Sequence, residues 1–406
     1  MTSAPPLYAS FDVVPAPKGA AVHIGAFARA LGEAFGRIDL VTVAPPDQPP
    51  PTDRGKACWK GVHHHPLPAR GEHLIARVLA FRAALSRWLG GRRVPLAHVR
   101  SIYEGYPLAL RKGAGVDRFL FEVNGLPSLE LKYHYPGVAE DRELLSKLRA
   151  QEDACLAAAD LVLTPSAVTA SHLASRGVSP ERLRVVPNGV DLPLFPHAPP
   201  VSRAEGPLRL LYAGTFTAWQ GVGLAVEALA LLRRELPATL TLVGPARERQ
   251  SRALRERAQA LGVGPHVTLL PPVSQEELAR LHHAHDVVLA PLVDNDRNRV
   301  QGACPLKLLE AMAAGTPVVA SDLPIVREVA EGGVHALLVR PNSPRAIKDA
   351  LLRLRTEPGL ALRLSEAARA HVEARFSWER AQRELVEAYE ALGIRRSSTR
   401  DSPSAS

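Results

Sequence analysis

The stretch from Cys304 to Ser321, CPLKLLEAMAAGTPVVAS, contains one complete helix followed by one buried strand. Pro305 suits the first helical position, where a missing N–H costs nothing, and Gly315 suits the left-handed position just past a helix end. Leu306, Leu309, Met312 and Ala313 recur at the spacing of a core face. The stretch therefore predicts a helix of about ten residues, bounded at both ends.

Lys307 and Glu310 share a different face of that helix. A cation in the first turn is unexpected, because the helix dipole is positive there. A bound anion removes the objection, since free N–H groups and an ammonium together make a phosphate site. Glu310 lies one turn further along, where it suits the hydroxyls of a ribose attached to that phosphate. A surface helix with one solvated ion pair is the alternative.

The segment from Leu309 to Ala320, LEAMAAGTPVVA, resembles the nucleotide-sugar signature of glycosyltransferase family 4, which comprises retaining enzymes of the GT-B fold. The resemblance covers most of residues 7–392. It implies an α/β protein with two doubly wound Rossmann-like domains that face a central cleft. It also implies that Glu310 binds the ribose of a nucleotide-sugar donor.

Length and composition agree with a two-domain globular protein. The chain has 406 residues, of which 22% are charged and 46% hydrophobic. It shows neither a bilayer-crossing apolar run nor a signal-like start, so we expect a cytoplasmic protein, with possible contact at the inner face of the membrane. The net charge of +9 favours anionic partners, but few aromatics and no recognised motif argue against nucleic acid.

Alternating strands and helices predict the domain organisation. We expect an N-terminal acceptor-side domain over residues 1–196 and a C-terminal donor-binding domain over residues 197–375. A final helix at 376–392 returns to the first domain, and residues 395–406 form a disordered tail. In the first domain, a strand from Leu7 leads through a loop with Gly19 into a helix, a geometry that lets backbone N–H groups approach a phosphate or sugar. The family has a Gly-Gly pair where this chain has Gly19-Ala20.

Polar residues follow two further predicted strands, His98–Tyr106 and Arg118–Gly125. Ligands of open parallel sheets sit beyond the carboxyl ends of strands, so Glu104, Glu122 and Asn124 are cleft candidates. Family 4 enzymes often carry a His near the place of Asn124, and Asn cannot exchange a proton near neutral pH. We take Glu122 and Asn124 as the catalytic candidates.

Two other segments have competing interpretations. Adjacent histidines on an extended segment point to opposite faces, so His63, His64 and His65 are expected in a solvated loop rather than at a metal. The helix from Glu72 to Leu89 could bind anionic lipid, but its arginines fall on different sides. A helix packed on the core is the preferred interpretation.

The chain departs from the family pattern at the donor diphosphate and at the sugar. Two basic residues usually hold the diphosphate where this chain has Thr215 and Gln220, between Gly214 and Gly221. We expect Lys307 and its helix N-terminus to compensate, with Arg297 or Arg299 as alternatives. The family's first Glu, near the transferred hexose, stands eight positions before Glu310, where this chain has Gly302. Backbone N–H groups of the loop from Arg299 to Cys304 could serve instead.

The resemblance implies a retaining glycosyltransferase that uses a nucleotide-diphosphate sugar and a saccharide or lipid-linked acceptor in building a surface polysaccharide. No metal and no cofactor are expected. A non-catalytic relative in an assembly complex and a nucleotide-sugar epimerase are the alternatives. The implied donor-binding residues, with Pro272 and Val273 near the base, are Gly19, Gly214, Thr215, Gln220, Pro272, Val273, Gly302, Ala303, Cys304, Lys307, Leu308 and Glu310.

Overall fold

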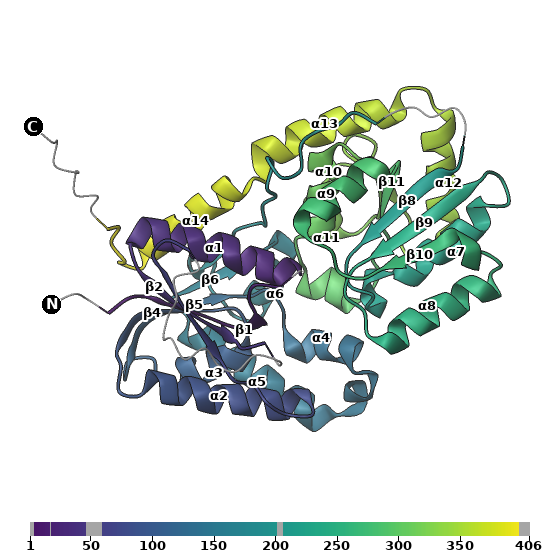
Figure 1. The fold of residues 1–406 in the computed structure, drawn as a ribbon. Coiled ribbons are helices and arrows are strands. Elements are labelled where there is room, and N and C mark those ends of the chain that lie inside the picture. Colours follow the sequence, from purple (N-terminus) through teal and green to yellow (C-terminus); the bar gives the residue numbers. More distant parts are fainter. Residues whose placement is uncertain (1–3, 17, 46–58, 201–205, 398–406) are drawn as a thin grey trace, which may run out of the picture.

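The computed structural model describes residues 4–16, 18–45, 59–200 and 206–397. The chain forms two α/β units side by side, one built from its first half and one mostly from its second (Figure 1). The first sheet has seven parallel strands in the order β3-β2-β1-β4-β5-β6-β7, and the second has six in the order β10-β9-β8-β11-β12-β13. The predicted fold class, with two doubly wound parallel sheets, is confirmed.

The first sheet consists of β1 (Leu7–Val13), β2 (Ile38–Val43), β3 (Val62–Leu67), β4 (Val94–Val99), β5 (Val116–Glu122), β6 (Leu161–Thr164) and β7 (Leu183–Val185). Its helices are α1 (Gly19–Phe35), α2 (Leu74–Leu89), α3 (Ile102–Ala109), α4 (Pro127–His134), α5 (Arg142–Ala158) and α6 (Ala167–Ser175).

The second sheet consists of β8 (Leu208–Ala213), β9 (Ala238–Val243), β10 (Val267–Leu270), β11 (Val287–Ala290), β12 (Val318–Ser321) and β13 (Leu337–Val339). Its helices are α7 (Val222–Leu232), α8 (Glu248–Ala260), α9 (Gln275–Ala284), α10 (Leu306–Ala314), α11 (Pro324–Arg327), α12 (Pro344–Thr356) and α13 (Leu360–Arg375). The chain ends in α14 (Trp378–Ala391).

Both sheets are covered on both faces, as their apolar strands require. Along β1, Leu7 and Ala9 belong to one core cluster and Tyr8 to another, because successive side chains point to opposite faces. Leu211 and Tyr212 divide the second sheet in the same way. No described helix is long and apolar enough to cross a membrane.

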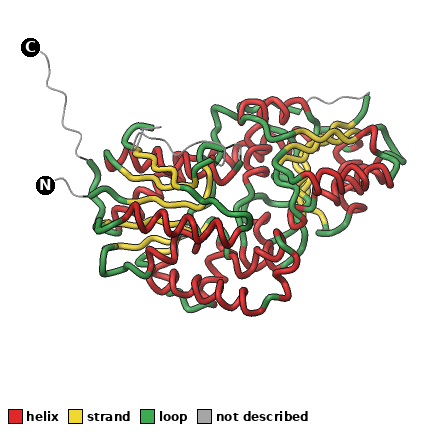
Figure 2. Tube along the Cα trace, turned by 60° about the horizontal axis from the view of Figure 1, so that its bottom comes forward, coloured by secondary structure: helices red, strands yellow, loops and turns green. Residues whose placement is uncertain are grey.

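The final helix crosses back to the first unit. Figure 1 shows α13 along the second unit and α14 beside α1 of the first, and in Figure 2 the strands gather in two separate groups, one in each unit. Trp378, Leu385 and Tyr389 of α14 are buried in one core cluster with Tyr8 and Phe27. Helix α14 therefore forms part of the first unit's core, although it comes from the far end of the chain.

Two expectations for the first unit are wrong. His63, His64 and His65 lie in β3, which pairs with β2 so that His64 faces Leu40, and not in a loop. The stretch predicted as one strand, His98–Tyr106, is the end of β4 followed by α3. Ser101 and Glu104 form a capping box at the start of α3, and this local bonding ends the strand.

Other expectations hold or lie partly outside the described residues. Helix α2 packs on the core through Val78, Phe81 and Leu85, as preferred. Pro305 is the N-cap of α10 rather than its first residue. Residues 398–406 of the predicted C-terminal tail lie outside the described residues.

Replacing Gly315 by Ala tests the end of α10. Gly315 has φ of 83°, and an added Cβ would lie 2.6 Å from the carbonyl oxygen of Ala198. Gly333 has φ of 78° but no heavy atom within 4 Å of such a Cβ. Gly333→Ala should lower the free energy of unfolding by about 1–2 kcal/mol from backbone strain alone. Gly315→Ala should lower it further, and equal losses in denaturant unfolding would contradict the close approach.

Candidate active site

Two helix N-termini meet in the cavity between the two units. Gly19 begins α1 and Leu306 begins α10, and a Cβ added at Gly19 would lie 3.0 Å from Leu306 Cδ1. Both residues line a cavity of about 430 Å³. The first N–H groups of a helix lack helical partners and carry the positive end of its dipole. The cavity is therefore preorganised for an anion.

Lys307 adds a cation to this position. Its Nζ donates a hydrogen bond to Gln220 Oε1 at 2.7 Å and lies 4.1 Å from the centroid of the Tyr212 ring. A Cβ at Gly214 would be 2.8 Å from the same Nζ, so a side chain there would displace the ammonium from this position. Burial lowers the pKa of Lys307 to about 7, which Glu310 counteracts only in part. An ammonium with so little compensating charge is ready to bind an anion.

Glu310 lines the same cavity, one turn further along α10. Glu310 is only 8% exposed, which excludes the alternative of a surface helix with a solvated ion pair. Burial raises the pKa of Glu310 to about 7, and the charge of Lys307 lowers it only in part. Among the described residues, no hydrogen bond or ion pair engages this carboxylate. Its oxygens are therefore free to accept hydrogen bonds from a ligand.

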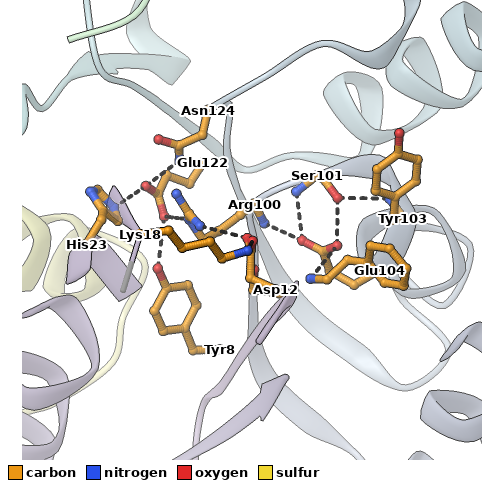
Figure 3. Close-up of polar contacts among 12 residues, drawn as sticks. Tyr8, Asp12, Lys18, His23, Arg100, Ser101, Tyr103, Glu104, Glu122 and Asn124 are labelled. Atoms are coloured by element: carbon orange, nitrogen blue, oxygen red, sulfur yellow. Dashed lines mark hydrogen bonds and ion pairs between the residues drawn. The ribbon is translucent and has the colours of Figure 1, made fainter. Parts of the chain in front are cut away.

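The opposite wall of the cavity rests on the Glu122 carboxylate at the end of β5 (Figure 3). His23 Nε2 lies 2.5 Å from Oε1, and the Tyr8 hydroxyl donates to Oε2 at 3.2 Å. Asn124 Nδ2 donates to Oε1 at 2.5 Å, and Arg100 Nε lies 3.5 Å from Oε2. Burial alone would raise the pKa of Glu122, but His23 and Arg100 hold it well below its usual value.

His23 connects this cluster to the second unit. Its Nδ1 lies 2.8 Å from Asn188 Oδ1, and Asn188 Nδ2 donates to the backbone oxygen of Cys304 at 2.8 Å. Through these contacts the His23 ring ties α1 to the loop that leads into α10.

The structure brings most of the predicted site residues into one cavity. Its lining includes Gly19, Asn124, Gly214, Thr215, Gln220, Pro272, Val273, Ala303, Cys304, Lys307 and Glu310. Three predicted residues are placed elsewhere: Glu122 lies behind His23 and Asn124, Leu308 is fully buried in the core, and Gly302 packs on α6. Glu122 is thus placed to position its neighbours rather than to touch a ligand.

Gly302 has a close-packing role. A Cβ at Gly302 would lie 2.5 Å from Thr169 Oγ1, and the backbone has φ of 80°. Its N–H already donates to the carbonyl oxygen of Arg297 at 3.2 Å. The expectation that this N–H contacts the sugar is therefore not supported, whereas Ala303 and Cys304 remain in the cavity lining.

Sequence reasoning missed several residues that line the cavity. They are Lys18, His23, Arg100, Asn188, Trp219 and Asn298. His23 could have been found, because it follows Gly19 by one helical turn and so shares its face. Glu104, a cleft candidate from the sequence, is instead fully buried at the start of α3, where it accepts hydrogen bonds from Ser101 and Arg100. Among the described residues, no cluster of His, Cys, Asp and Glu could hold a metal.

Comparison with known proteins defines the class. The fold matches sucrose-phosphate synthase from Thermosynechococcus elongatus with a TM-score of 0.78 and 24% identity, over 96% of this chain and 99% of that one. It also matches Anabaena HepE in complex with UDP and glucose, with a TM-score of 0.73 and 17% identity, over 95% of this chain and 99% of that one. The fold is that of the GT-B glycosyltransferases.

The sequence then gives the family. A model described as glycosyl transferases group 1 matches residues 207–357, and one described as glycosyltransferase family 4 matches residues 17–193. D-inositol 3-phosphate glycosyltransferase 1 of Catenulispora acidiphila is 31% identical over 91% of this chain and 90% of its own. The enzyme of that name from Xylanimonas cellulosilytica is 33% identical, but the match spans only 60% of either chain. The protein belongs to glycosyltransferase family 4.

Glu122→Gln should destabilise the protein by about 3–5 kcal/mol at neutral pH, because Arg100 and His23 lose a buried counter-charge. The pKa of Glu122 is depressed in the folded state, so its contribution is present above its usual value of 4.5 and is lost as pH falls through the lower folded pKa. The difference between wild type and variant in denaturant unfolding should shrink at acid pH.

Glu104 provides a control, because its contribution to stability should change with pH in the opposite direction. Burial raises its pKa from 4.5 to about 6, so the folded state holds this proton more tightly than the unfolded state. The wild type should lose stability relative to Glu104→Gln as pH rises from 4.5 to 6. Parallel pH profiles for the two variants would contradict the assigned charge states.

Proposed function

We propose that this enzyme is a retaining glycosyltransferase that moves a sugar from a nucleotide-diphosphate sugar to a saccharide or lipid-linked acceptor in building a surface polysaccharide. The observation that carries the proposal is the start of α10, where a desolvated Lys307 ammonium and free N–H groups face the cavity and Glu310 follows one turn later. The UDP-glucose complex of HepE, which shares the fold, supports a nucleotide-sugar donor.

In this proposal, each part of the donor has its own place along the wall that the second unit provides. The diphosphate lies at the N-terminus of α10 beside Lys307, and Glu310 accepts hydrogen bonds from the ribose hydroxyls. The base lies near Pro272 and Val273, which line the cavity beyond β10. Gly214 and Gln220 shape the space around the diphosphate, with Gln220 oriented toward Lys307.

The reaction then requires charge stabilisation more than side-chain proton transfer. The bond between the anomeric carbon and the diphosphate oxygen breaks as the acceptor oxygen bonds to that carbon, and the acceptor proton passes to the departing diphosphate. Lys307 and the two helix N-termini stabilise the charge that develops on the leaving group. Asn124, held by Glu122, orients the sugar or the acceptor by hydrogen bonding.

Contact with an anionic membrane surface is a separate part of the proposal. Ile75 and Leu79 lie one turn apart on α2 and are 50% and 58% exposed. Because α2 packs on the core through Val78, Phe81 and Leu85, these two side chains lie outside that contact, and with the net charge of +9 they support peripheral contact with anionic lipid in addition to the core packing.

Replacement of Glu310 by Ala tests the proposed ribose contact. The variant should lower the affinity for UDP or another nucleoside diphosphate by about tenfold or more, because hydrogen bonds to a charged acceptor are lost. Calorimetry against UDP, GDP and ADP measures the effect, with Glu373→Ala on the outer face of α13 as control. Absence of nucleotide binding in the wild type would instead favour a non-catalytic relative.

The affinity for the intact sugar nucleotide should be greatest near pH 7. Lys307 must be charged to bind the diphosphate, and its pKa of about 7 in the free protein means that affinity falls as pH rises. Glu310 must be ionised to accept from the ribose, and its pKa of about 7 means that affinity falls as pH drops.

Two variants separate the acid side of this pH dependence from the alkaline side. Glu310→Gln should remove the decline on the acid side, and Lys307→Met the decline on the alkaline side, each at the cost of weaker binding at pH 7. Dissociation constants measured by calorimetry across acid and alkaline pH test both. A wild-type affinity that does not change with pH would refute the assigned roles.

A further inference from the structure

Arg297 is a buried cation in the lining of the same cavity. It is only 7% exposed, and its guanidinium carbon lies 3.9 Å from the centroid of the Trp219 ring. It comes from the irregular turn Arg297–Gln301 between β11 and α10. Stacking on an aromatic face fixes the plane of the guanidinium.

The charge of Arg297 is poorly compensated. Its one carboxylate neighbour within 4 Å, among the described residues, is Glu130 of α4, whose Oε2 lies 3.9 Å from Nε. That oxygen already accepts from Gln301 Nε2 at 2.8 Å. Arg297 Nε has no hydrogen-bond partner within the described part of the chain, and Nη1 makes only a long contact of 3.4 Å to Asn298 Oδ1. The cavity thus has a second cation that lacks a close anion.

This second cation is distinct from the diphosphate site. Lys307 Nζ contacts Gln220, one of the two positions where the resembled family has its basic pair, and lies close to Gly214. With the N-terminus of α10, it can balance the two charges of a diphosphate. Arg297 lies against Trp219, the residue before Gln220, and reaches toward α4 of the first unit.

The loop before α10 carries a cation into the cavity, whereas the resembled family carries an anion on this loop. That family places a carboxylate near the transferred hexose, where this chain has Gly302, which packs on α6. The same loop instead brings a guanidinium into the cavity. A carboxylate suits the hydroxyls of a neutral sugar and repels an acidic one, whereas a guanidinium forms a planar, bidentate pair with a carboxylate.

We propose that the transferred sugar is a hexuronate and that Arg297, stacked on Trp219, binds its carboxylate. This inference rests on the proposed nucleotide-sugar function and specifies its substrate class. The transfer itself is the one given above: the bond from the anomeric carbon to the diphosphate breaks, the bond to the acceptor oxygen forms, and the sugar carboxylate is unchanged.

The test compares donors that differ only in this group. Calorimetry with UDP, GDP and ADP first finds the preferred base, and the hexose and hexuronate donors of that base, such as UDP-glucose and UDP-glucuronate, are then titrated. The wild type should bind the hexuronate about tenfold or more tightly. Arg297→Gln should abolish this preference while leaving the affinity for the free nucleoside diphosphate unchanged.

Controls separate charge recognition from structural damage. Arg299→Gln, two residues along the same turn, removes an exposed arginine paired with Asp294 and should keep the preference. Arg297→Lys keeps a charge but not the planar guanidinium, so it should reduce the preference for the hexuronate without abolishing it. If Arg297→Gln does not fold, the Arg297→Lys variant provides the test.

Three outcomes overturn the inference. Equal affinity of the wild type for the two donors excludes recognition of the carboxylate. An equal loss of affinity for the free nucleoside diphosphate in Arg297→Gln assigns Arg297 to the diphosphate and leaves the proposed function intact. Failure of the wild type to bind any nucleotide refutes the proposed function itself, and this inference with it.

Discussion

The buried carboxylate of Glu122 organises the wall of the cavity that the first unit provides. It fixes His23 and Asn124, which line the cavity, and it accepts from Tyr8 within the core. His98 lies 3.0 Å from it and bonds through its other nitrogen to the hydroxyl of Tyr389 in α14. A single anion therefore holds together the first sheet, the returning helix and, through His23 and Asn188, the loop before α10. An unpaired carboxylate could not remain there, because burial of an isolated charge costs far more than one interaction returns.

The second unit, in contrast, buries two ionisable groups that have few partners. Glu122 is surrounded by donors, whereas Lys307 and Glu310 are buried with few partners, and burial moves both of their pKa values toward neutrality. A protein tolerates such groups where a ligand supplies the missing partners. The two walls therefore differ: the first is a complete hydrogen-bonded network, whereas the second leaves Lys307 and Glu310 with room for partners from the proposed donor.

Much of this arrangement follows from sequence, because it depends on local signals. The proline and glycine that bound α10, the apolar strands and the alternation of strands and helices identify two parallel sheets. The start of α3 was not predicted, because the capping pair Ser101 and Glu104 interrupts a stretch whose sequence pattern is otherwise that of one strand. The partners of Glu122 were not predicted for another reason. Tyr8, His23 and His98 are distant from Glu122 in sequence, and only the strand order and the path of α1 bring them together. Without the sheet order, a carboxylate at a strand end looks equally suited to touch a ligand or to hold its neighbours.

The departures from the family pattern form a single, mutually consistent set. Lys307 Nζ lies 2.7 Å from Gln220 Oε1, so a basic residue with its charge at that point would meet a second ammonium at contact distance. A neutral acceptor at position 220 thus lets the ammonium of α10 lie there, and the glycine at position 214 leaves it undisturbed. Gly302 likewise lets the preceding loop pack against Ser166 and Thr169, where any side chain would collide. That close packing goes with the inward placement of Arg297 on Trp219. The positive charges that the second unit brings to the cavity therefore come from α10 and from the turn that precedes it, whereas its first loop contributes the neutral Thr215 and Gln220.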